Sequence, residues 1–118
     1  MVDSKPVQFI RGTATALPEV EEGSVCNKTA FKAGKKNFLF LGSDGEGYDV
    51  KLKLQESLEE AAEFSTGQGE SMNVGSNGWV DLEFSHDKSL PQPVLVRWIR
   101  ESYRLLVPRK LHSKLEGN

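Results

Sequence analysis

The basic residues of this sequence fall into two clusters, and charge of this kind can bind phosphate. Residues 28–36 contain four lysines and no acidic residue, a net charge of +4, and residues 91–118 contain six basic and two acidic residues, again +4. Residues 55–90, which separate them, carry eight acidic residues and one lysine. Because lysine and arginine bind the phosphate oxygens of nucleic acids, the two clusters would form one binding surface if folding brings them together.

Each cluster lies on a predicted element that exposes its side chains. Ala33-Gly34-Lys35 separates two strand-like runs, and glycine supplies the positive φ that a tight hairpin turn needs. In the last predicted helix three arginines recur at spacings of three and four and form one ridge, with Glu101 as a partial counter-ion to Arg97. The predicted phosphate contacts are Lys28, Lys32, Lys35, Lys36, Arg97, Arg100, Arg104, Arg109 and Lys110. The alternative is that both clusters only keep a hairpin and a helix face solvated.

Two aromatic residues could stack on bases or frame a ligand pocket, namely Trp79 and Tyr103. Packing in the core is the competing interpretation for both, because large aromatic side chains usually anchor small domains. Trp79 begins an alternating strand, residues 79–84, whose apolar residues share the other face, so it is predicted to project away from the core. Three phenylalanines of the hairpin strands are predicted to lie in the core: Phe31, Phe38 and Phe40.

No combination of residues predicts catalysis, a metal site or a cofactor. Cys26 is the single cysteine, has no base nearby in the sequence, and is expected to be a small buried hydrophobe. With one cysteine, His86 and His112 are too few for a zinc site. Gly34-Lys35-Lys36 lacks the first glycine and the Ser or Thr of a phosphate loop, and the acidic turn at residues 44–49 lacks the spacing of a calcium loop. We therefore expect neither an enzyme nor a cofactor.

The length of 118 residues and the mass of 13.1 kDa predict one domain, residues 1–118. Hydrophobic residues make up 37% of the chain, enough for a core, but no run approaches the roughly 20 apolar residues of a bilayer span. No signal-peptide core follows Met1, so we expect a cytoplasmic protein, and a monomer. The net charge of −2 argues against a surface covered uniformly by phosphate contacts.

Three helices are predicted from proline positions and apolar spacing. The first follows Ser4 and stops at Pro18, and the last lies between Pro93 and Pro108. A short helix begins at Ser57, with Glu60 three residues on as its capping-box partner. The predicted apolar face of the last helix consists of Leu95, Trp98, Ile99, Ser102, Leu105 and Leu106.

The residue pattern of the strands predicts a sheet with one buried face. Residues 48–54 alternate between apolar and charged without exception, which indicates antiparallel pairing. A glycine- and serine-rich stretch, residues 65–78, separates the short helix from the strand at residues 79–84. The fold class is therefore α+β: an N-terminal helix, an antiparallel sheet of about four to six strands, and a C-terminal amphipathic helix.

Five short motifs occur in order and at compatible spacings: Leu17-Pro18-Glu19-Val20-Glu21, residues 29–38, Val50-Lys51-Leu52-Lys53, Gly78-Trp79-Val80-Asp81-Leu82, and residues 98–105 with Lys110-Leu111. In these motifs, which cover most of the chain, the sequence resembles the MmcQ/YjbR family. The resemblance implies a small α+β domain with an antiparallel sheet, similar to the double-wing arrangement, and DNA binding as the family's label. One departure is that many relatives carry basic residues just before the tryptophan, whereas residues 72–78 have none here.

Two functions of different classes follow. The first is weak, sequence-independent DNA binding, in which the basic hairpin and the basic last helix contact the sugar-phosphate backbone. The second is a non-enzymatic module that binds a small ligand or a protein partner through the exposed sheet face around Trp79. Geometry decides between them, because the first requires the lysine hairpin and the arginine helix to be neighbours.

Overall fold

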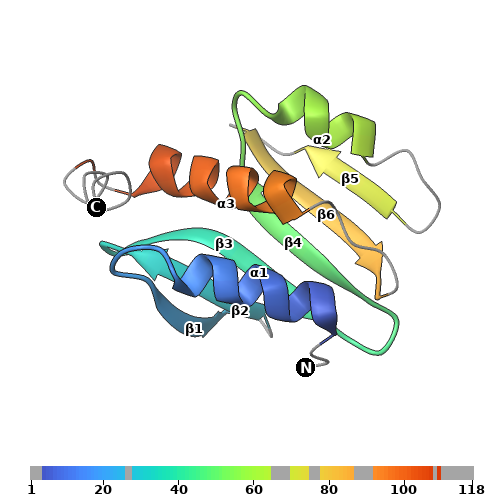
Figure 1. Ribbon diagram of the computed structural model, residues 1–118, viewed down its shortest axis with the longest axis horizontal. Coiled ribbons are helices and arrows are strands. Elements are labelled where there is room, and N and C mark those ends of the chain that lie inside the picture. Colours follow the sequence, from blue (N-terminus) through green and yellow to red (C-terminus); the bar gives the residue numbers. More distant parts are fainter. Residues whose placement is uncertain are drawn as a thin grey trace.

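The computed structural model describes residues 4–25, 28–64, 70–74, 78–86, 92–107 and 109. Within these residues three helices and six strands follow one another (Figure 1). In order they are α1 (Lys5–Thr15), β1 (Glu21–Val25), β2 (Lys28–Ala33), β3 (Lys36–Ser43), β4 (Gly47–Lys53), α2 (Leu58–Phe64), β5 (Glu70–Val74), β6 (Trp79–Ser85) and α3 (Gln92–Leu106). This arrangement confirms the predicted α+β class, with helices at both ends of the described chain. None of these helices combines the length and apolarity that crossing a membrane would require.

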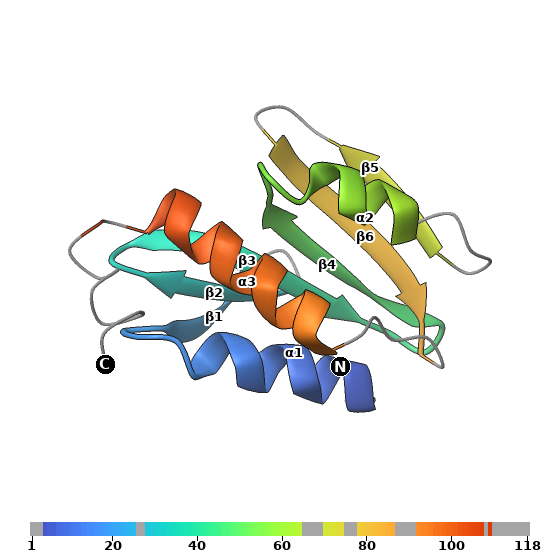
Figure 2. The same ribbon diagram turned by 45° about the horizontal axis from the view of Figure 1, so that its top comes forward.

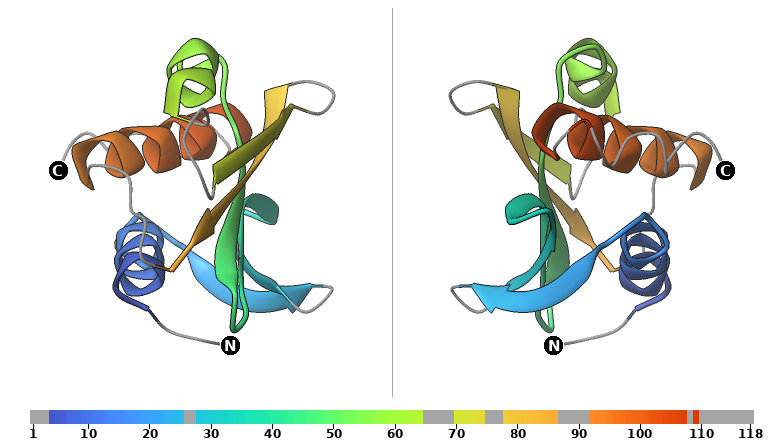
Figure 3. Two further views of the ribbon diagram at one scale, coloured as in Figure 1. Left: turned by 90° about the vertical axis from the view of Figure 1, so that its right-hand side faces the viewer. Right: turned by 90° about the vertical axis from the view of Figure 1, so that its left-hand side faces the viewer.

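The strands form one sheet in the order β1-β2-β3-β4-β6-β5, and every neighbouring pair is antiparallel. Seen along the sheet, all three helices lie on the same side of it (Figure 3). One face of the sheet is therefore covered, and the other, which we call the helix-free face, carries no helix of the described chain. Such a two-layer fold requires strands that are apolar on one side only.

The predicted alternation produces this division. In β4 the side chains of Tyr48, Val50 and Leu52 are buried, while the residues between them are exposed or half-buried. β6 repeats the pattern, so Trp79 projects to the helix-free face as predicted. The buried residues of both strands belong to one core cluster with those of α1 and α3. Burial of this many apolar side chains, at about 1.5–3 kcal/mol each, is the main force that holds the helices on the sheet.

Two strands were not predicted. β1 lies at a sheet edge with all five residues exposed, and β5 lies at the other edge, within the glycine- and serine-rich stretch for which no strand was predicted. The sequence of β1, Glu21 to Val25, offers neither alternation nor strand-forming residues before Val25. An edge strand of this kind forms because its neighbour offers unpaired backbone groups, a signal that local sequence does not carry.

β3 contains an irregularity that corrects the prediction for its phenylalanines. The β2–β3 register pairs Phe31 with Leu39 but Lys32 with Asn37, so Phe38 is the extra residue of a β-bulge. Both Phe38 and Leu39 are fully buried, whereas Phe40 is half-buried. The prediction that Phe40 shares a core face with Phe38 is therefore wrong, because the bulge breaks the alternation between them and leaves Phe40 on the helix-free face.

α3 packs with a slightly different face from the predicted one. Tyr103 is fully buried, its ring meets Phe38 edge-on at 5.3 Å between centroids, and its hydroxyl donates a hydrogen bond to the Pro18 carbonyl at 2.8 Å. Leu105, predicted to be buried, is 36% exposed. Tyr103 is drawn inward because α1 covers that side of α3 and the loop after α1 supplies an acceptor for its hydroxyl.

Candidate nucleic-acid interface

The basic hairpin and the described end of the basic last helix lie at one end of the molecule. The β2–β3 turn and the C-terminal end of α3 lie at the same end of the sheet (Figures 1 and 2). Two contacts fix this arrangement: the ring packing of Tyr103 on Phe38, and a 2.5 Å hydrogen bond from the Ser102 hydroxyl to the Phe38 carbonyl. Ser102 also accepts a 2.9 Å hydrogen bond from the backbone N–H of Lys53. The last turns of α3 therefore hold the start of β3 and the end of β4.

The hairpin tip is a two-residue turn with left-handed backbone. Gly34 has φ +57° and Lys35 has φ +73°, which is the geometry that a tight turn between twisted strands needs. Glycine adopts it at no cost, but a lysine there costs about 1–2 kcal/mol. The structure thus confirms the predicted turn and places an exposed lysine at its apex in spite of the backbone cost.

Replacing Lys35 with asparagine should stabilise the fold. Asparagine tolerates left-handed backbone better than lysine, so Lys35→Asn should raise the free energy of unfolding by about 0.5–1 kcal/mol. Urea denaturation of both proteins measures the difference. The matched control is Lys36→Asn, since Lys36 lies in regular β3 and asparagine is unfavourable in strands. Stabilisation by both variants, or by neither, would contradict the role assigned to the backbone of Lys35.

The hairpin half of the helix-free face combines lysines with aromatic rings. The strand registers place Lys32 opposite Asn37, Phe40 opposite Lys51, and Lys53 opposite Trp79. None of the ion pairs found between described residues involves the lysines at this end of the sheet, which we call the hairpin-end lysines: Lys32, Lys35, Lys36, Lys51 and Lys53. Lys36, which pairs with the buried Ala33, lies on the helix-covered side of the tip. Lys51 and Lys53 were not predicted as site residues, because in the sequence they are simply the polar residues of an alternating strand.

Two half-buried rings lie among these lysines. Phe40 and Trp79 approach to 6.0 Å between ring centroids with an interplanar angle of 51°, although they belong to β3 and β6 with β4 between them. An aromatic pair that spans an intervening strand covers the backbone and the stems of the side chains beneath it. Trp79 therefore remains a candidate for stacking. Tyr103 does not, because its fully buried ring has no exposed face on which a base could lie.

The opposite half of the helix-free face is acidic and internally paired. Lys28, predicted to contact phosphate, donates a 2.6 Å hydrogen bond to the Asp49 carboxylate, and this bond raises the pKa of the Lys28 ammonium above its usual range. Asp49 lies on β4 and reaches Lys28 on β2 by passing over Gly42 of β3. A Cβ at Gly42 would overlap the Asp49 Oδ1, so a larger residue there would displace the carboxylate from this ion pair. Lys28 is therefore engaged within the protein.

Asp81 is the carboxylate nearest to the aromatic pair, and its position disfavours the charged form of its side chain. Its Oδ1 is buried and accepts no hydrogen bond from the described residues. Burial raises the pKa of the Asp81 carboxyl above its usual range, and the charges of Asp49 and Glu83 raise it further, against a lowering by Lys28 and by Lys51, which lies opposite on β4. The folded state therefore binds a proton at Asp81 more tightly than the unfolded state, so stability from this group declines as pH rises through its pKa.

Asp81→Asn should therefore stabilise the protein at neutral pH. The gain should be up to about 1 kcal/mol at pH 7, since solvent reaches much of this side chain and screens its interactions, and it should vanish near the pKa of about 3.8 that a free aspartate shows. Urea denaturation at the two pH values measures it. Glu83→Gln removes the same charge from an exposed position on the same strand and serves as the control. A gain for Asp81→Asn that does not change with pH would contradict the assignment.

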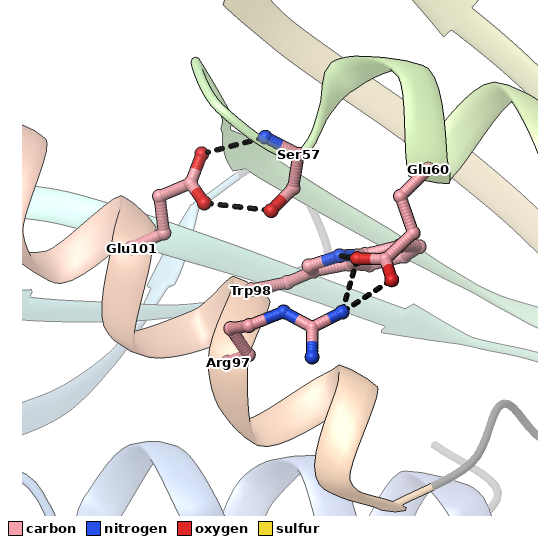
Figure 4. Close-up of polar contacts among 5 residues, drawn as sticks. All are labelled: Ser57, Glu60, Arg97, Trp98 and Glu101. Atoms are coloured by element: carbon pink, nitrogen blue, oxygen red, sulfur yellow. Dashed lines mark hydrogen bonds and ion pairs between the residues drawn. The ribbon is translucent and has the colours of Figure 1, made fainter.

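The arginine ridge of α3 is embedded in carboxylates. Arg97 and Arg104 line a hollow of about 680 Å³ between α2 and α3, together with the four glutamates Glu56, Glu59, Glu60 and Glu101. Arg97 forms an ion pair with Glu60, which also accepts a 2.8 Å hydrogen bond from the Trp98 indole N–H (Figure 4). These bonds, first that of Arg97, lower the pKa of the Glu60 carboxyl. Arg97 and Arg104 thus meet acidic side chains of α2, α3 and the turn before α2 rather than an open surface.

Glu101 has a different partner from the predicted one. Its carboxylate accepts hydrogen bonds from the backbone N–H groups of Gln55, Glu56 and Ser57, at 2.7, 3.0 and 3.3 Å, and from the Ser57 hydroxyl at 2.7 Å (Figure 4). It therefore caps the turn that leads into α2, residues 55–57, from another helix, and it is not the counter-ion of Arg97. The predicted capping box is also absent, because Glu60 turns toward α3 instead of toward Ser57.

Loss of this cap should be costly. A charged acceptor of several N–H groups contributes about 2 kcal/mol, so Glu101→Ala should lower the free energy of unfolding by about that amount. Urea denaturation monitored by circular dichroism measures it. Glu59→Ala is the matched control, since this exposed glutamate of α2 makes no such bond, and its effect should stay within about 0.5 kcal/mol. Equal effects of the two variants would contradict the capping role.

Several predicted residues are not placed by these contacts. Arg109 is exposed beyond the end of α3, while Lys110, Cys26 and His112 lie outside the described residues. Within the described residues no three His, Cys, Asp or Glu side chains form a group that could hold a metal ion. His86 instead joins segments: its Nδ1 lies 2.8 Å from the Ser4 hydroxyl, next to the start of α1, and its Nε2 meets the Asp44 carbonyl.

Comparison with known proteins supports this description of the fold. The family model named YjbR matches residues 15–105 of the chain. The chain is also similar to a solved structure, the crystal structure of Deinococcus radiodurans protein DR2400 with the family-model domain DUF419. The two share 19% sequence identity at a TM-score of 0.64, over 98% of this chain and 96% of that one. No curated protein matches the chain.

Proposed function

Because the chain belongs to the YjbR family, and the resemblance of its motifs implies DNA binding, we propose that it binds DNA weakly and without sequence preference through the hairpin-end lysines. It acts as a cytoplasmic monomer without catalysis. The phosphate backbone is the target, since lysine ammonium groups act as point charges toward phosphate and carry no information about sequence.

The observation that carries this proposal is the convergence of positive charge at the hairpin. Five lysines from β2, the turn, β3 and β4 surround one end of the sheet, and none takes part in the ion pairs found between described residues. A surface cluster that served only the fold would be expected to pair with nearby carboxylates, as Lys28 does with Asp49. The hairpin tip carries lysines on both faces of the sheet, which suits a hairpin that lies along a DNA groove or along the sugar-phosphate backbone.

The arginines of α3 have a smaller part in this proposal than the sequence suggested. Arg97 already holds Glu60, and Arg104 lies beside four glutamates of the hollow. A phosphate approaching this surface meets repulsion from those carboxylates as well as attraction from the guanidinium groups. The positive field that remains is centred on the hairpin, and a chain with net charge −2 must concentrate its binding there.

A salt titration of duplex DNA binding tests the proposal. Fluorescence anisotropy of a labelled duplex should show binding at about 50 mM salt that weakens steeply, because each phosphate contact releases condensed counterions. About four contacts predict a slope near −3.6 for the logarithm of the association constant against the logarithm of salt concentration. Absence of binding at low salt, or binding that salt does not change, would overturn the proposal.

A second candidate is the non-enzymatic module that binds a protein or a small ligand through the face around Trp79. The half-buried pair of Phe40 and Trp79 favours it, because neither ring is needed to fill the core. Binding of this kind depends on apolar contact and changes little with salt, whereas binding to phosphate depends on salt strongly. The same titration therefore separates the two candidates.

A further inference from the structure

The aromatic pair occupies a position that the core does not require. Six other aromatic residues are buried and belong to the core cluster beneath the helices: Phe31, Phe38, Tyr48, Phe84, Trp98 and Tyr103. Phe40 and Trp79 instead lie half-buried on the helix-free face, where no helix of the described chain covers them. Rings in this position present part of their faces to solvent, and a sheet surface with such rings can take up flat, polarisable groups.

Charge surrounds the pair asymmetrically. Lys51 lies opposite Phe40 and Lys53 opposite Trp79, so two ammonium groups arise from β4 directly between the rings. Lys32 adds a third charge on the same face, two strands from Lys53. A ligand that places a ring on Phe40 or Trp79 would therefore place its neighbouring groups against lysines, which favours an anionic, ring-bearing ligand over an apolar one.

We infer that Phe40 and Trp79 stack on unpaired bases of single-stranded DNA while Lys32, Lys51 and Lys53 contact the flanking phosphates. This inference deepens the proposed function and rests on it, because the same lysines supply the phosphate contacts. In a duplex each base is stacked between its neighbours and shows only its edge in the grooves, so a ring on a sheet surface cannot reach its face. Single strands expose that face, and aromatic side chains bind it whatever the sequence.

The acidic half of the face sets the path of the strand. Asp49 and Glu83 lie toward the other ends of β4 and β6, and Asp81, opposite Lys51, borders the basic half of the face; all three would repel phosphates. The strand therefore crosses the sheet at the hairpin end, from Lys32 over β3 and β4 to Trp79, rather than running along the strands. A path across three or four β-strands spaced by about 4.8 Å accommodates only a few nucleotides, in the range of small single-strand binding sites.

Paired measurements on single and double strands test this inference. The probes are fluorescein-labelled oligo(dT) of about 12 nucleotides and a duplex of the same length. The wild-type protein should bind the single strand about 10-fold more tightly, with quenching of Trp79 fluorescence; Trp98 is fully buried and serves as a constant background. Phe40→Leu and Trp79→Leu should each weaken single-strand binding about 10-fold or more and leave duplex binding within about twofold.

The control and the outcomes separate the inference from the proposed function. Phe9→Leu removes a partly buried aromatic from α1, away from the face, and should change neither affinity. Thermal unfolding of every variant shows whether it is folded, and Phe40→Leu retains Trp79 as a fluorescent reporter. Duplex binding by a wild type that shows no preference for oligo(dT), or whose single-strand affinity survives both leucine variants, overturns the inference and leaves the proposed function intact. Absence of binding to either probe overturns both.

Discussion

Replacing Lys32, Lys35 and Lys36 together with glutamine should lower the affinity for duplex DNA about 100-fold at about 0.1 M salt. Each of these ammonium groups lies at the hairpin, and none belongs to an ion pair found between described residues. Their removal abolishes counterion release as well as attraction, so the slope of the salt dependence should fall by about 0.9 for each phosphate that a lysine no longer neutralises. Anisotropy titrations of the labelled duplex at several salt concentrations measure both quantities.

The matched comparison is a triple variant of α3 in which Arg97, Arg100 and Arg104 become glutamine. It changes the net charge by the same amount, but two of its three charges, those of Arg97 and Arg104, lie beside the glutamates that line the hollow. We expect its affinity to stay within about fivefold of the wild type, with a nearly unchanged slope. A larger loss from the arginine variant than from the lysine variant would move the interface to the helix and refute the assignment to the hairpin.

Ser102→Ala should lower the free energy of unfolding by about 3 kcal/mol. The Ser102 hydroxyl is fully buried, donates to the Phe38 carbonyl and accepts from the Lys53 N–H. Alanine leaves both backbone groups without their partner in a site that water does not reach, and each such group costs about 1–3 kcal/mol. Urea denaturation gives the difference in the free energy of unfolding.

Two further variants serve as controls for this prediction. Ser24→Ala removes a hydroxyl from exposed β1 and should change stability by less than about 0.5 kcal/mol. Ser102→Cys keeps a side chain of similar shape with a weaker donor, so its cost should lie between those of serine and alanine. If Ser102→Ala were no more harmful than Ser24→Ala, the bonds of Ser102 could not be what ties α3 to the bulge.

Much of the fold could be predicted because local patterns and tertiary packing agree. The strict alternation of residues 48–54 and 79–84 specified which side of each strand is buried, and β4 and β6 follow it residue by residue. Pro93 lies in the first turn of α3, and Gly34 lies in the hairpin turn, as their backbone preferences require. The family resemblance rested on motifs within these same elements, so the order of the motifs and the local residue patterns predicted the same fold.

The rest depended on partners far away in the sequence. Phe40 was assigned to the core because regular strand alternation places it on the same face as Phe38. The β-bulge that breaks this alternation cannot be recognised from the sequence. Glu60 and Glu101 were assigned local partners on their own helices, yet Glu60 binds α3, 37 residues away, and Glu101 binds the start of α2, 44–46 residues away. A pairing of this kind becomes visible only when the packing of α2 against α3 is known.

The candidate site shows the same limit. Counting charge along the sequence found the hairpin lysines but treated the arginines as equivalent to them, because the acidic residues of α2 are distant in sequence. Lys51 and Lys53 were overlooked because they sit on the polar side of a strand whose apolar side explained the pattern. Charge that is dispersed along the chain becomes a cluster only through strand register, which links Lys32, Lys53 and Trp79 across four strands.

The short reach of β4 along β3 has a consequence for the dynamics of the hairpin. Pairing between these strands begins at Leu39 and Leu52, so the segment from Ala33 to Asn37 extends past the end of the β4 ladder and relies on β2. β1 pairs with β2 only as far as Lys32, so the tip beyond it has two strands, and such an end can open without disturbing the core. Amide protons there should exchange with solvent through local fraying rather than global unfolding. The tip can thus adjust to the irregular spacing of a flexible polyanion while the layers behind it stay rigid.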